Sequence, residues 1–375
     1  MVIHHLLVFK LPKWVLHRIN KIKRSFLWMK SGAAPGARPN PLVNWGTVCR
    51  PKDLGGLGVF DLEKFGRALR LRWPWFSWME LERPWQGMAL PCDKTDMELF
   101  RASTDIAVGD GARCLFWHDR WLPGGALKFQ FPELFYIATR KSRTVQKELH
   151  DRNWMKSLFR ISTPAQIDQF VSLWERLRDV ALQPRPDAIS WRWTASGVYS
   201  AASAYRCQFS GACPPFRAAK IWKSQAEPKC RFFAWLAVHG KILTADNLAI
   251  RGWPHNPICQ LCRIHPESAR HLLLECTFTT AVREKIFDWN GSIGIAPPPL
   301  GHDINGWWDG MLAGIPKEKR QKASGNFIYT MWGCWKERNR RVFRNTALQP
   351  DLVAHLVREE IEQRRFAHTQ DPGGI

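Results

Sequence analysis

Four side chains that commonly bind metal ions lie close together in the second half of the chain. They are Cys259, Cys262, His271 and Cys276, and their spacing is C-x2-C-x8-H-x4-C. Three thiols and one imidazole at these intervals are typical of a closed zinc site. The alternatives to a zinc site are that the four residues are unrelated to each other, or that two of the cysteines form a disulfide. Because four protein ligands leave no open position, we expect one structural Zn²⁺ that activates no water.

The last two ligands, His271 and Cys276, constrain the backbone between them. Residues five positions apart on one ideal helix point about 140° away from each other. We therefore expect a helix that opens near His271 to end or bend before Cys276. Around the motif the sequence predicts a helix with Pro228 in its first turn and Gly240 as its C-terminal stop, and two more over 245–251 and 279–289, the former with Thr244 as its N-cap. The first of these is strongly apolar and should be central to the core of the zinc domain.

The composition indicates a polyanionic partner and a reducing environment. The chain has 375 residues, with 55 Lys and Arg against 33 Asp and Glu, and its formal net charge is +22. Such a charge favours nucleic acid, either RNA or DNA, as the partner. The other seven cysteines are scattered without a disulfide pattern, and neither a signal peptide nor a membrane span of about 18 apolar residues is recognisable. We expect an intracellular protein, nuclear or cytoplasmic, that is not secreted and has no membrane partner.

Two basic helices are the candidates for contacting phosphate groups. One is predicted over Pro12–Lys30, with Ile22 and Phe26 in its apolar stripe and most basic residues off that stripe. The other lies in the C-terminal region. The candidate contacts are Arg18, Lys21 and Arg24 on the first helix, and Arg338, Arg340, Arg341 and Arg344 on the second. The alternative is that these side chains are solvated or paired with Glu337, Glu359 and Glu360.

The pattern of the whole chain predicts a mainly α fold with minor β hairpins. The expected parts are a helical segment over 1–80, an irregular linker region over 81–186, a small zinc-stabilised helical domain over 187–296 and a basic helical tail over 297–375. A short hairpin is expected from Trp191 to Ser200, and Leu115–Trp121 reads as strand-like. The prolines of 183–186 and 297–299 mark two of the boundaries.

Five stretches, taken together and in order, resemble a known family. They are Leu11–Trp14 through Phe26–Trp28 with Asn44-Trp45, Gly55–Gly58 and Ala68-Leu69; Val108–Gly111 with Phe116–Leu122; Trp191–Trp193 with Gly197–Ser200 and Ser203–Tyr205; Ile221-Trp222, Pro228-Lys229 and Phe232–Leu236 with the metal motif; and Trp332–Trp335 with Glu337–Asn339 and Arg341–Phe343. With these stretches the chain resembles the C-terminal part of a plant non-LTR (LINE-type) retrotransposon reverse transcriptase, including its zinc-binding domain. Individually only the stretch with the metal motif is specific. The resemblance also favours His271 over His265 as the zinc ligand.

The resemblance implies a role in holding template RNA or target DNA near a polymerase, without catalysis by this chain. A polymerase palm needs clustered carboxylates for two divalent metals, and the family's Asp-Asp pair is missing, since this sequence has no Asp-Asp dipeptide. The carboxylate set of a ribonuclease H is not recognisable after Val342, and we expect no small-molecule substrate. The expected function is therefore that of a non-catalytic, zinc-binding, nucleic-acid-binding fragment. The alternatives are a structural or protein-interaction module that packed on the missing polymerase palm, and a functionless retroelement relic. A palm supplied in trans is the candidate protein partner.

Overall fold

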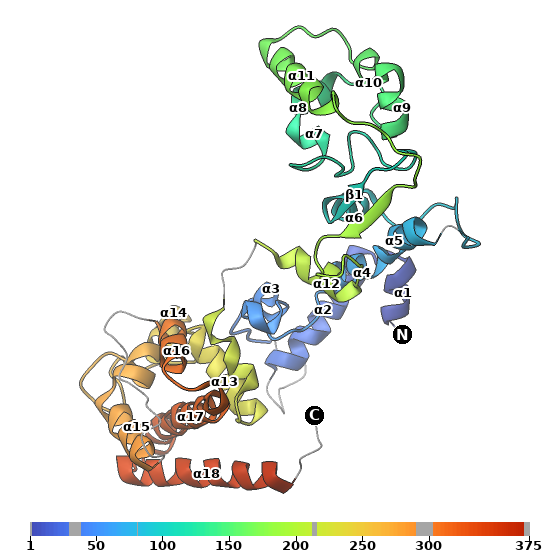
Figure 1. The fold of residues 1–375 in the computed structure, drawn as a ribbon. Helices are drawn as coiled ribbons and strands as arrows, with labels where there is room; N and C mark the ends of the chain where they lie inside the picture. Colours follow the sequence, from blue (N-terminus) through green and yellow to red (C-terminus); the bar gives the residue numbers. More distant parts are fainter. Residues whose placement is uncertain (1, 30–38, 81, 212–215, 290–302, 371–375) are drawn as a thin grey trace. The chain divides into compact units, whose positions relative to one another are not determined.

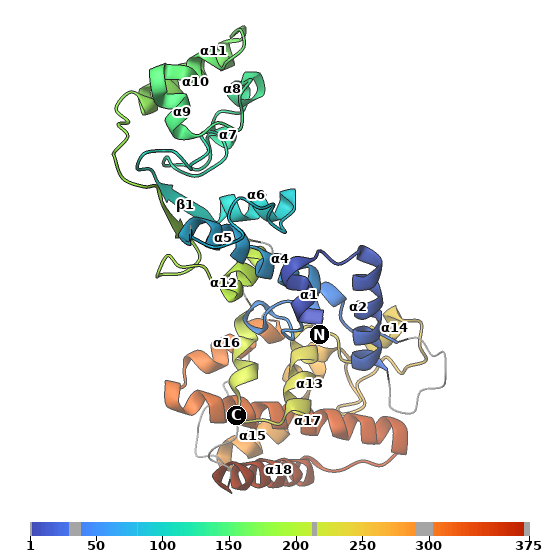
Figure 2. The same ribbon diagram turned by 90° about the vertical axis from the view of Figure 1, so that its right-hand side faces the viewer.

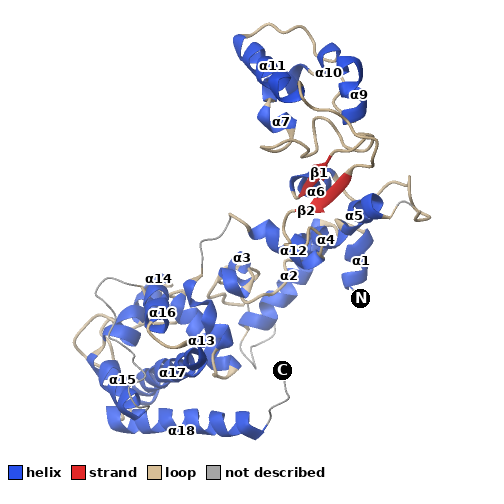
Figure 3. Ribbon diagram, in the orientation of Figure 1, coloured by secondary structure: helices blue, strands red, loops and turns tan. Residues whose placement is uncertain are grey.

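The computed structural model describes residues 2–29, 39–80, 82–211, 216–289 and 303–370 (Figure 1). The chain forms two compact units, each built from two separate stretches of sequence. Unit 1 comprises Met1–Ile19 and Phe60–Ala212, and unit 2 comprises Asn20–Val59 and Cys213–Ile375. Within the described ranges, helices predominate and a single sheet of two antiparallel strands is present (Figure 3). The predicted fold class, mainly α with little β structure, is confirmed.

Unit 1 is a succession of short helices. Its elements are α1 (Val2–Val8), the first part of α2 (Lys13–Trp28), α4 (Leu62–Arg70), α5 (Arg72–Met79), α6 (Lys94–Ala102), β1 (Thr104–Ala107), α7 (Leu127–Gln130), α8 (Pro132–Ile137), α9 (Val145–Leu149), η2 (His150–Arg152), α10 (Asn153–Lys156), α11 (Pro164–Leu177), β2 (Ala188–Trp191), α12 (Ala201–Arg206) and η3 (Cys207–Phe209). Leu6 of α1 packs with Leu62 and Leu69 of α4, and all three side chains are buried. Buried side chains of this kind hold elements that are too short to be stable helices alone.

The two strands of unit 1 pair across a long stretch of sequence. Thr104 lies opposite Trp191 and Ala107 lies opposite Ala188. The predicted hairpin from Trp191 to Ser200 is wrong: the Trp191 N–H donates to the Gly197 carbonyl at 2.7 Å, but the residues after Gly197 enter α12 without forming a strand.

The region predicted as an irregular linker has a hydrophobic core of its own. Phe116, Trp117, Leu134, Trp154 and Leu173 are all at most 2% exposed. The strand-like stretch from Leu115 forms one isolated bridge, to Thr144, and otherwise consists of turns. Its helices have only four to six residues in most cases, which is too short for a helical period to show in the sequence.

A buried carboxylate holds the loop that precedes this core. Asp187 is 8% exposed and accepts hydrogen bonds from the backbone N–H groups of Gly109 and Gly111, at 2.8 and 2.9 Å, and of Arg113 and Cys114, both at 3.1 Å. Four backbone donors that would otherwise be buried without acceptors are therefore satisfied by one side chain.

Unit 2 contains the predicted metal motif. Its elements are the second part of α2, α3 (Trp45–Val48), η1 (Lys52–Leu54), η4 (Arg217–Lys223), α13 (Pro228–Val238), α14 (Ala245–Ile250), η5 (His271–Glu275), α15 (Thr277–Trp289), α16 (Ile304–Ala313), η6 (Lys317–Lys319), α17 (Arg320–Arg344) and α18 (Pro350–Gln370). The apolar helix α13 begins at Pro228 as predicted and buries Phe233 and Trp235. Thr244 is the N-cap of α14, but its side chain makes no capping hydrogen bond.

The long helix α17 runs through the core of unit 2 and packs against α13, α15 and α18 (Figure 2). Its first half is buried on nearly all sides from Ala323 to Met331. A helix surrounded in this way is a core element, although its sequence also carries the densest group of arginines in the chain. Gly333 allows α18 to approach closely, since a Cβ atom at that position would lie 2.4 Å from Val357 Cγ2.

Two further predictions differ from the structure. The apolar stripe predicted on the first basic helix packs only in its first half: Ile19 is half-buried against the Leu6 cluster, whereas Ile22 and Phe26 are 62% and 91% exposed. The predicted domain limits near residues 80 and 186 fall inside unit 1, because β2 and α12 pack with β1 and α4. The limit near residue 296, with the prolines of 297–299, lies outside the described residues.

No described helix combines the length and the apolar character that a bilayer crossing requires.

Candidate metal centre

The four predicted ligands converge in unit 2. One ligand atom from each of Cys259, Cys262, His271 and Cys276 lies within 4.8 Å of all the others. The Sγ atoms of Cys259 and Cys276 are 3.9 Å apart, and Cys262 Sγ is 3.3 Å from His271 Nε2. Zinc–sulfur bonds of about 2.3 Å in a tetrahedron place ligand atoms about 3.8 Å from each other. The cluster therefore fits one tetrahedral zinc ion, with Nε2 as the ligand atom of the histidine.

The first two ligands lie on a tight turn. The Cys259 carbonyl accepts from the Arg263 N–H at 2.8 Å, and the Cys259 N–H donates to the His265 carbonyl at 2.9 Å. Arg263 has a left-handed backbone with φ of 57°, and Ile258 forms an antiparallel bridge with Pro266. We call this turn, residues 258–266, the knuckle. It directs the thiols of both cysteines toward the same point. His265 contributes its backbone to the knuckle and does not join the four-ligand cluster.

The last two ligands are brought together by a wide helical turn. His271–Glu275 form a π-helical turn, and the Cys276 N–H donates to the His271 carbonyl at 2.7 Å. This i to i+5 bond places residues five apart above each other, which an α-helix does not. Cys276 itself has an extended backbone, with ψ of 128°, before α15 begins at Thr277. The expected break before Cys276 is confirmed.

The protonation of the cluster suits a metal ion. Burial, reinforced by His265, lowers the pKa of His271, which favours the neutral imidazole that a metal needs. The hydrogen bond between Cys259 and Cys276 raises the pKa of the first thiol and lowers that of the second, so these two sulfurs compete for one proton. A zinc ion would replace that proton and hold both sulfurs as thiolates.

Arg338, a predicted phosphate contact, instead forms a buried ion pair with the metal-binding loop. Its guanidinium donates to both carboxylate oxygens of Glu267, with distances of 2.6 to 3.1 Å. The two side chains are 5% and 1% exposed. Glu267 lies between Cys262 and His271, and it also accepts from the Ala245 N–H at 3.0 Å, at the start of α14. One carboxylate therefore joins the metal-binding loop, α14 and α17.

Arg341, one turn further along α17, contacts the knuckle itself. Its guanidinium donates to the carbonyl oxygens of Gln260 and Leu261 at 3.0 and 2.9 Å, and to the carboxylate of Glu337 at 2.8 Å. The Arg341 side chain is 11% exposed and the Glu337 side chain is fully buried. Both arginines belong to α17. Arg338 through Glu267, and Arg341 through the two carbonyl oxygens, hold the metal-binding loop against that helix. We call these two residues the arginine clamp.

The other predicted phosphate contacts lie nearer to the solvent. Arg340 is 26% exposed and pairs with Glu337, and Arg344 is exposed at the end of α17. On α2, Arg18 and Lys21 are exposed, and Arg24 is half-buried with its guanidinium 5.6 Å from the ring centroid of Trp45. The structure brings the four metal ligands together, but it separates the seven basic residues into the clamp, a half-buried pair (Arg24 and Arg340) and an exposed set (Arg18, Lys21 and Arg344). The clamp has no local signal in the sequence, because Glu267 and Arg338 are 71 positions apart.

Comparison with known proteins identifies the class of domain that holds this site. Residues 199–282 match the family described as zinc-binding in reverse transcriptase. This stretch contains all four ligands, and the chain therefore contains a reverse transcriptase zinc-binding domain with a candidate site for one zinc ion.

A more extended similarity connects the chain to a plant protein. The chain is 26% identical over 407 aligned positions to an Arabidopsis thaliana protein named "Putative ribonuclease H protein". The match covers 98% of this chain and 62% of that protein's length. The predicted zinc-binding domain of a reverse transcriptase is therefore confirmed, and a distant similarity to a plant protein extends over nearly the whole chain.

Proposed function

We propose that this protein binds RNA or DNA through exposed basic side chains, on a fold that a structural zinc ion stabilises. The observation that carries the proposal is the combination of a reverse transcriptase zinc-binding domain with a net charge of +22. A surplus of positive charge of this size attracts phosphate backbones whatever their base sequence. When the protein neutralises phosphate groups, the nucleic acid releases its bound counterions. The proposal includes no polymerase activity, since the sequence has no Asp-Asp pair of the kind a palm uses.

The exposed basic residues are the candidates for phosphate contacts. Arg18 and Lys21 on α2 and Arg344 at the end of α17 have side chains that a nucleic acid could reach. Arg338 and Arg341 are not included in the proposal, because their guanidinium groups are occupied inside unit 2. Arginine suits the role, since its planar fork can donate two hydrogen bonds to one phosphate.

The test is a binding titration of the zinc-loaded chain against single-stranded RNA, single-stranded DNA and duplex DNA at several salt concentrations. Affinity should fall steeply with salt, and the variant Arg18→Ala/Lys21→Ala/Arg344→Ala should flatten the log–log slope by about 0.7–0.9 for each phosphate group that is no longer neutralised. The matched control is Lys147→Ala/Lys156→Ala/Arg178→Ala. It also removes three positive charges, from exposed positions elsewhere in the chain. Wild-type chain that binds none of the three nucleic acids at low salt would refute the proposal. A primer-extension assay with magnesium tests the absence of catalysis.

A protein-binding role is the second candidate, and the exposed apolar face of α2 favours it. Ile22 and Phe26 are 62% and 91% exposed. They lie four positions apart, which places them on one side of the helix. Large apolar side chains gathered in this way are typical of a protein contact, such as a polymerase palm supplied in trans. Binding of a purified palm that persists at high salt and is abolished in Ile22→Ser/Phe26→Ser would favour this role.

A further inference from the structure

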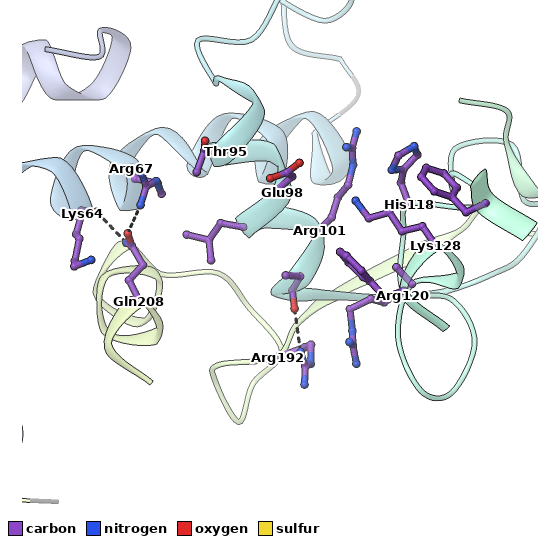
Figure 4. Close-up of a pocket in the computed structure, with 15 residues that line it drawn as sticks. Lys64, Arg67, Thr95, Glu98, Arg101, His118, Arg120, Lys128, Arg192 and Gln208 are labelled. Atoms are coloured by element: carbon purple, nitrogen blue, oxygen red, sulfur yellow. Dashed lines mark hydrogen bonds between the residues drawn. The ribbon is translucent and has the colours of Figure 1, made fainter. Parts of the chain in front are cut away.

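A cavity of about 910 Å³ lies in unit 1, lined by none of the metal ligands (Figure 4). Its walls come from α4, α6, α7, α8, η3 and the segments that follow the two strands. The cationic side chains in the wall are Lys64, Arg67, Arg101, Arg120, Lys128 and Arg192. Of the carboxylates in the described chain, Glu98 is the one that lines the cavity. The wall therefore carries a clear surplus of positive charge.

Nearby carboxylates balance only part of this charge. Arg120 and Arg192 share Asp105, at 2.9 and 3.5 Å, while Arg67 and Arg101 each face a buried aspartate. Among the described residues, Lys64 and Lys128 have no ion-pair partner. The Lys128 ammonium instead lies 4.7 Å from the ring centroid of Phe129.

The charges inside the cavity perturb one another. Burial lowers the pKa of His118 to about 4, and Lys128 and Arg101 add to that effect. The pKa of Lys128 is also lowered, by burial first and with a contribution from Arg101, although Glu98 opposes it. Figure 4 shows these side chains of α6, α7 and the intervening loop gathered on one side of the cavity. An anion in this place would be attracted by several cations that are already partly desolvated.

The rim of the cavity also presents an aromatic ring. Phe129 lines it and is 75% exposed, and Phe135 lines the same wall. An exposed ring beside phosphate-binding cations is the combination that single-strand-binding proteins use, because every base has a flat face that can stack.

We propose that this cavity binds a short stretch of single-stranded nucleic acid, with phosphates against Lys128 and Arg120 and one base stacked on Phe129. A duplex keeps its bases stacked on each other, whereas a single strand can turn a base toward a side chain. The inference rests on the proposed function of nucleic-acid binding, and it adds a specific site in unit 1 and a preference for single strands.

The test compares the full zinc-loaded chain with two pocket variants, using a fluorescent 12-nucleotide oligouridylate, the same length of duplex, and uridine monophosphate. Phe129→Leu keeps an apolar side chain but removes the stacking ring, and should weaken oligonucleotide binding about 5- to 150-fold if one base stacks. Lys64→Ala/Lys128→Ala should flatten the single-strand salt slope by about 0.7 for each phosphate group that the two lysines neutralise in the wild type. Neither lysine has an ion-pair partner in the described chain, so the double variant should fold. Phe159→Leu, which changes another exposed phenylalanine of unit 1, is the matched control. Cross-linking of a 5-iodouridine oligonucleotide should label the peptide that contains Phe129.

The outcomes separate this inference from the proposed function. If the wild-type chain binds no nucleic acid, both are refuted. If it binds, but both pocket variants keep wild-type affinity and slope, only the pocket is refuted. Equal binding of duplex and single strand would also overturn the pocket inference, as would mononucleotide binding as tight as that of the oligonucleotide. A preference for the oligonucleotide that Phe129→Leu removes and Phe159→Leu retains would support it.

Discussion

Replacing Arg338 by alanine should weaken zinc binding, although residue 338 touches no ligand atom. The change leaves the Glu267 carboxylate buried, at 1% exposure, without its cation. Removing one partner of a buried ion pair typically costs about 3–5 kcal/mol. Glu267 lies in the loop between the second and third zinc ligands, so part of this cost should appear as reduced metal affinity.

The expected size of that reduction follows from two independent estimates. Residues that orient metal ligands from outside the coordination sphere usually contribute about 10–100-fold in affinity. A cost of about 3 kcal/mol that fell entirely on the metal-bound state would correspond to about 100-fold, since each 1.4 kcal/mol is a factor of ten. We therefore expect zinc affinity to decrease about 10- to 100-fold, measured by competition with a chelator of known affinity.

Two further variants make the measurement specific. Arg338→Met/Glu267→Gln removes both charges while an amide oxygen can still accept from the Ala245 N–H, and it should recover much of the affinity because no isolated charge remains buried. Arg344→Ala removes an exposed arginine from the same helix and should change stability by less than about 0.5 kcal/mol. If Arg338→Ala kept wild-type zinc affinity and unfolding midpoint, the clamp would have no role in holding the knuckle.

Three other substitutions test separate parts of the fold. Cys276→Ser should abolish stoichiometric zinc by elemental analysis and increase hydrogen exchange across 220–290, whereas Cys92→Ser should do neither, and full zinc content in Cys276→Ser would contradict the ligand assignment. Asp187→Ala should destabilise unit 1 by about 2–4 kcal/mol, because it leaves four backbone N–H groups without their acceptor; unchanged exchange of the amides at 109–114 would count against this. Gly333→Ala should cost about 1–3 kcal/mol, because the new methyl group meets Val357, while Gly310→Ala, which meets no atom within 4 Å, serves as its control in the same denaturation assay.

The metal centre was predictable because its information is local. Four ligands within 18 residues define the chemistry, and the five-residue gap between His271 and Cys276 was enough to predict the break that the π turn supplies. The role of the α17 arginines was not predictable in the same way. A helix with both an apolar stripe and several arginines is compatible with a phosphate-binding surface and with a core helix, and only the position of Glu267 after folding distinguishes them.

The middle of the chain was poorly predicted for a different reason. Helices such as α7 and α10 have four residues each, so no periodic pattern can develop, and loop contacts to Asp187 take the place of regular structure. On α2 the period was correct, but a period does not indicate whether the stripe meets other parts of the same chain. Ile22 and Phe26 remain exposed in this structure.

The position of α17 determines how small an autonomous piece of this protein can be. The family match ends at residue 282, thirty-eight positions before α17 begins at Arg320. A recombinant fragment cut to the matched limits would contain every zinc ligand, yet it would lack Arg338 and Arg341 and would leave Phe233 without the Trp332 and Trp335 rings that pack on it. Because α18 in turn packs on α17 through Gly333, the minimal folding unit that retains zinc should extend through α18. A fragment that ended at residue 289 would be expected to lose its metal and aggregate, and its failure would say nothing about the ligands themselves.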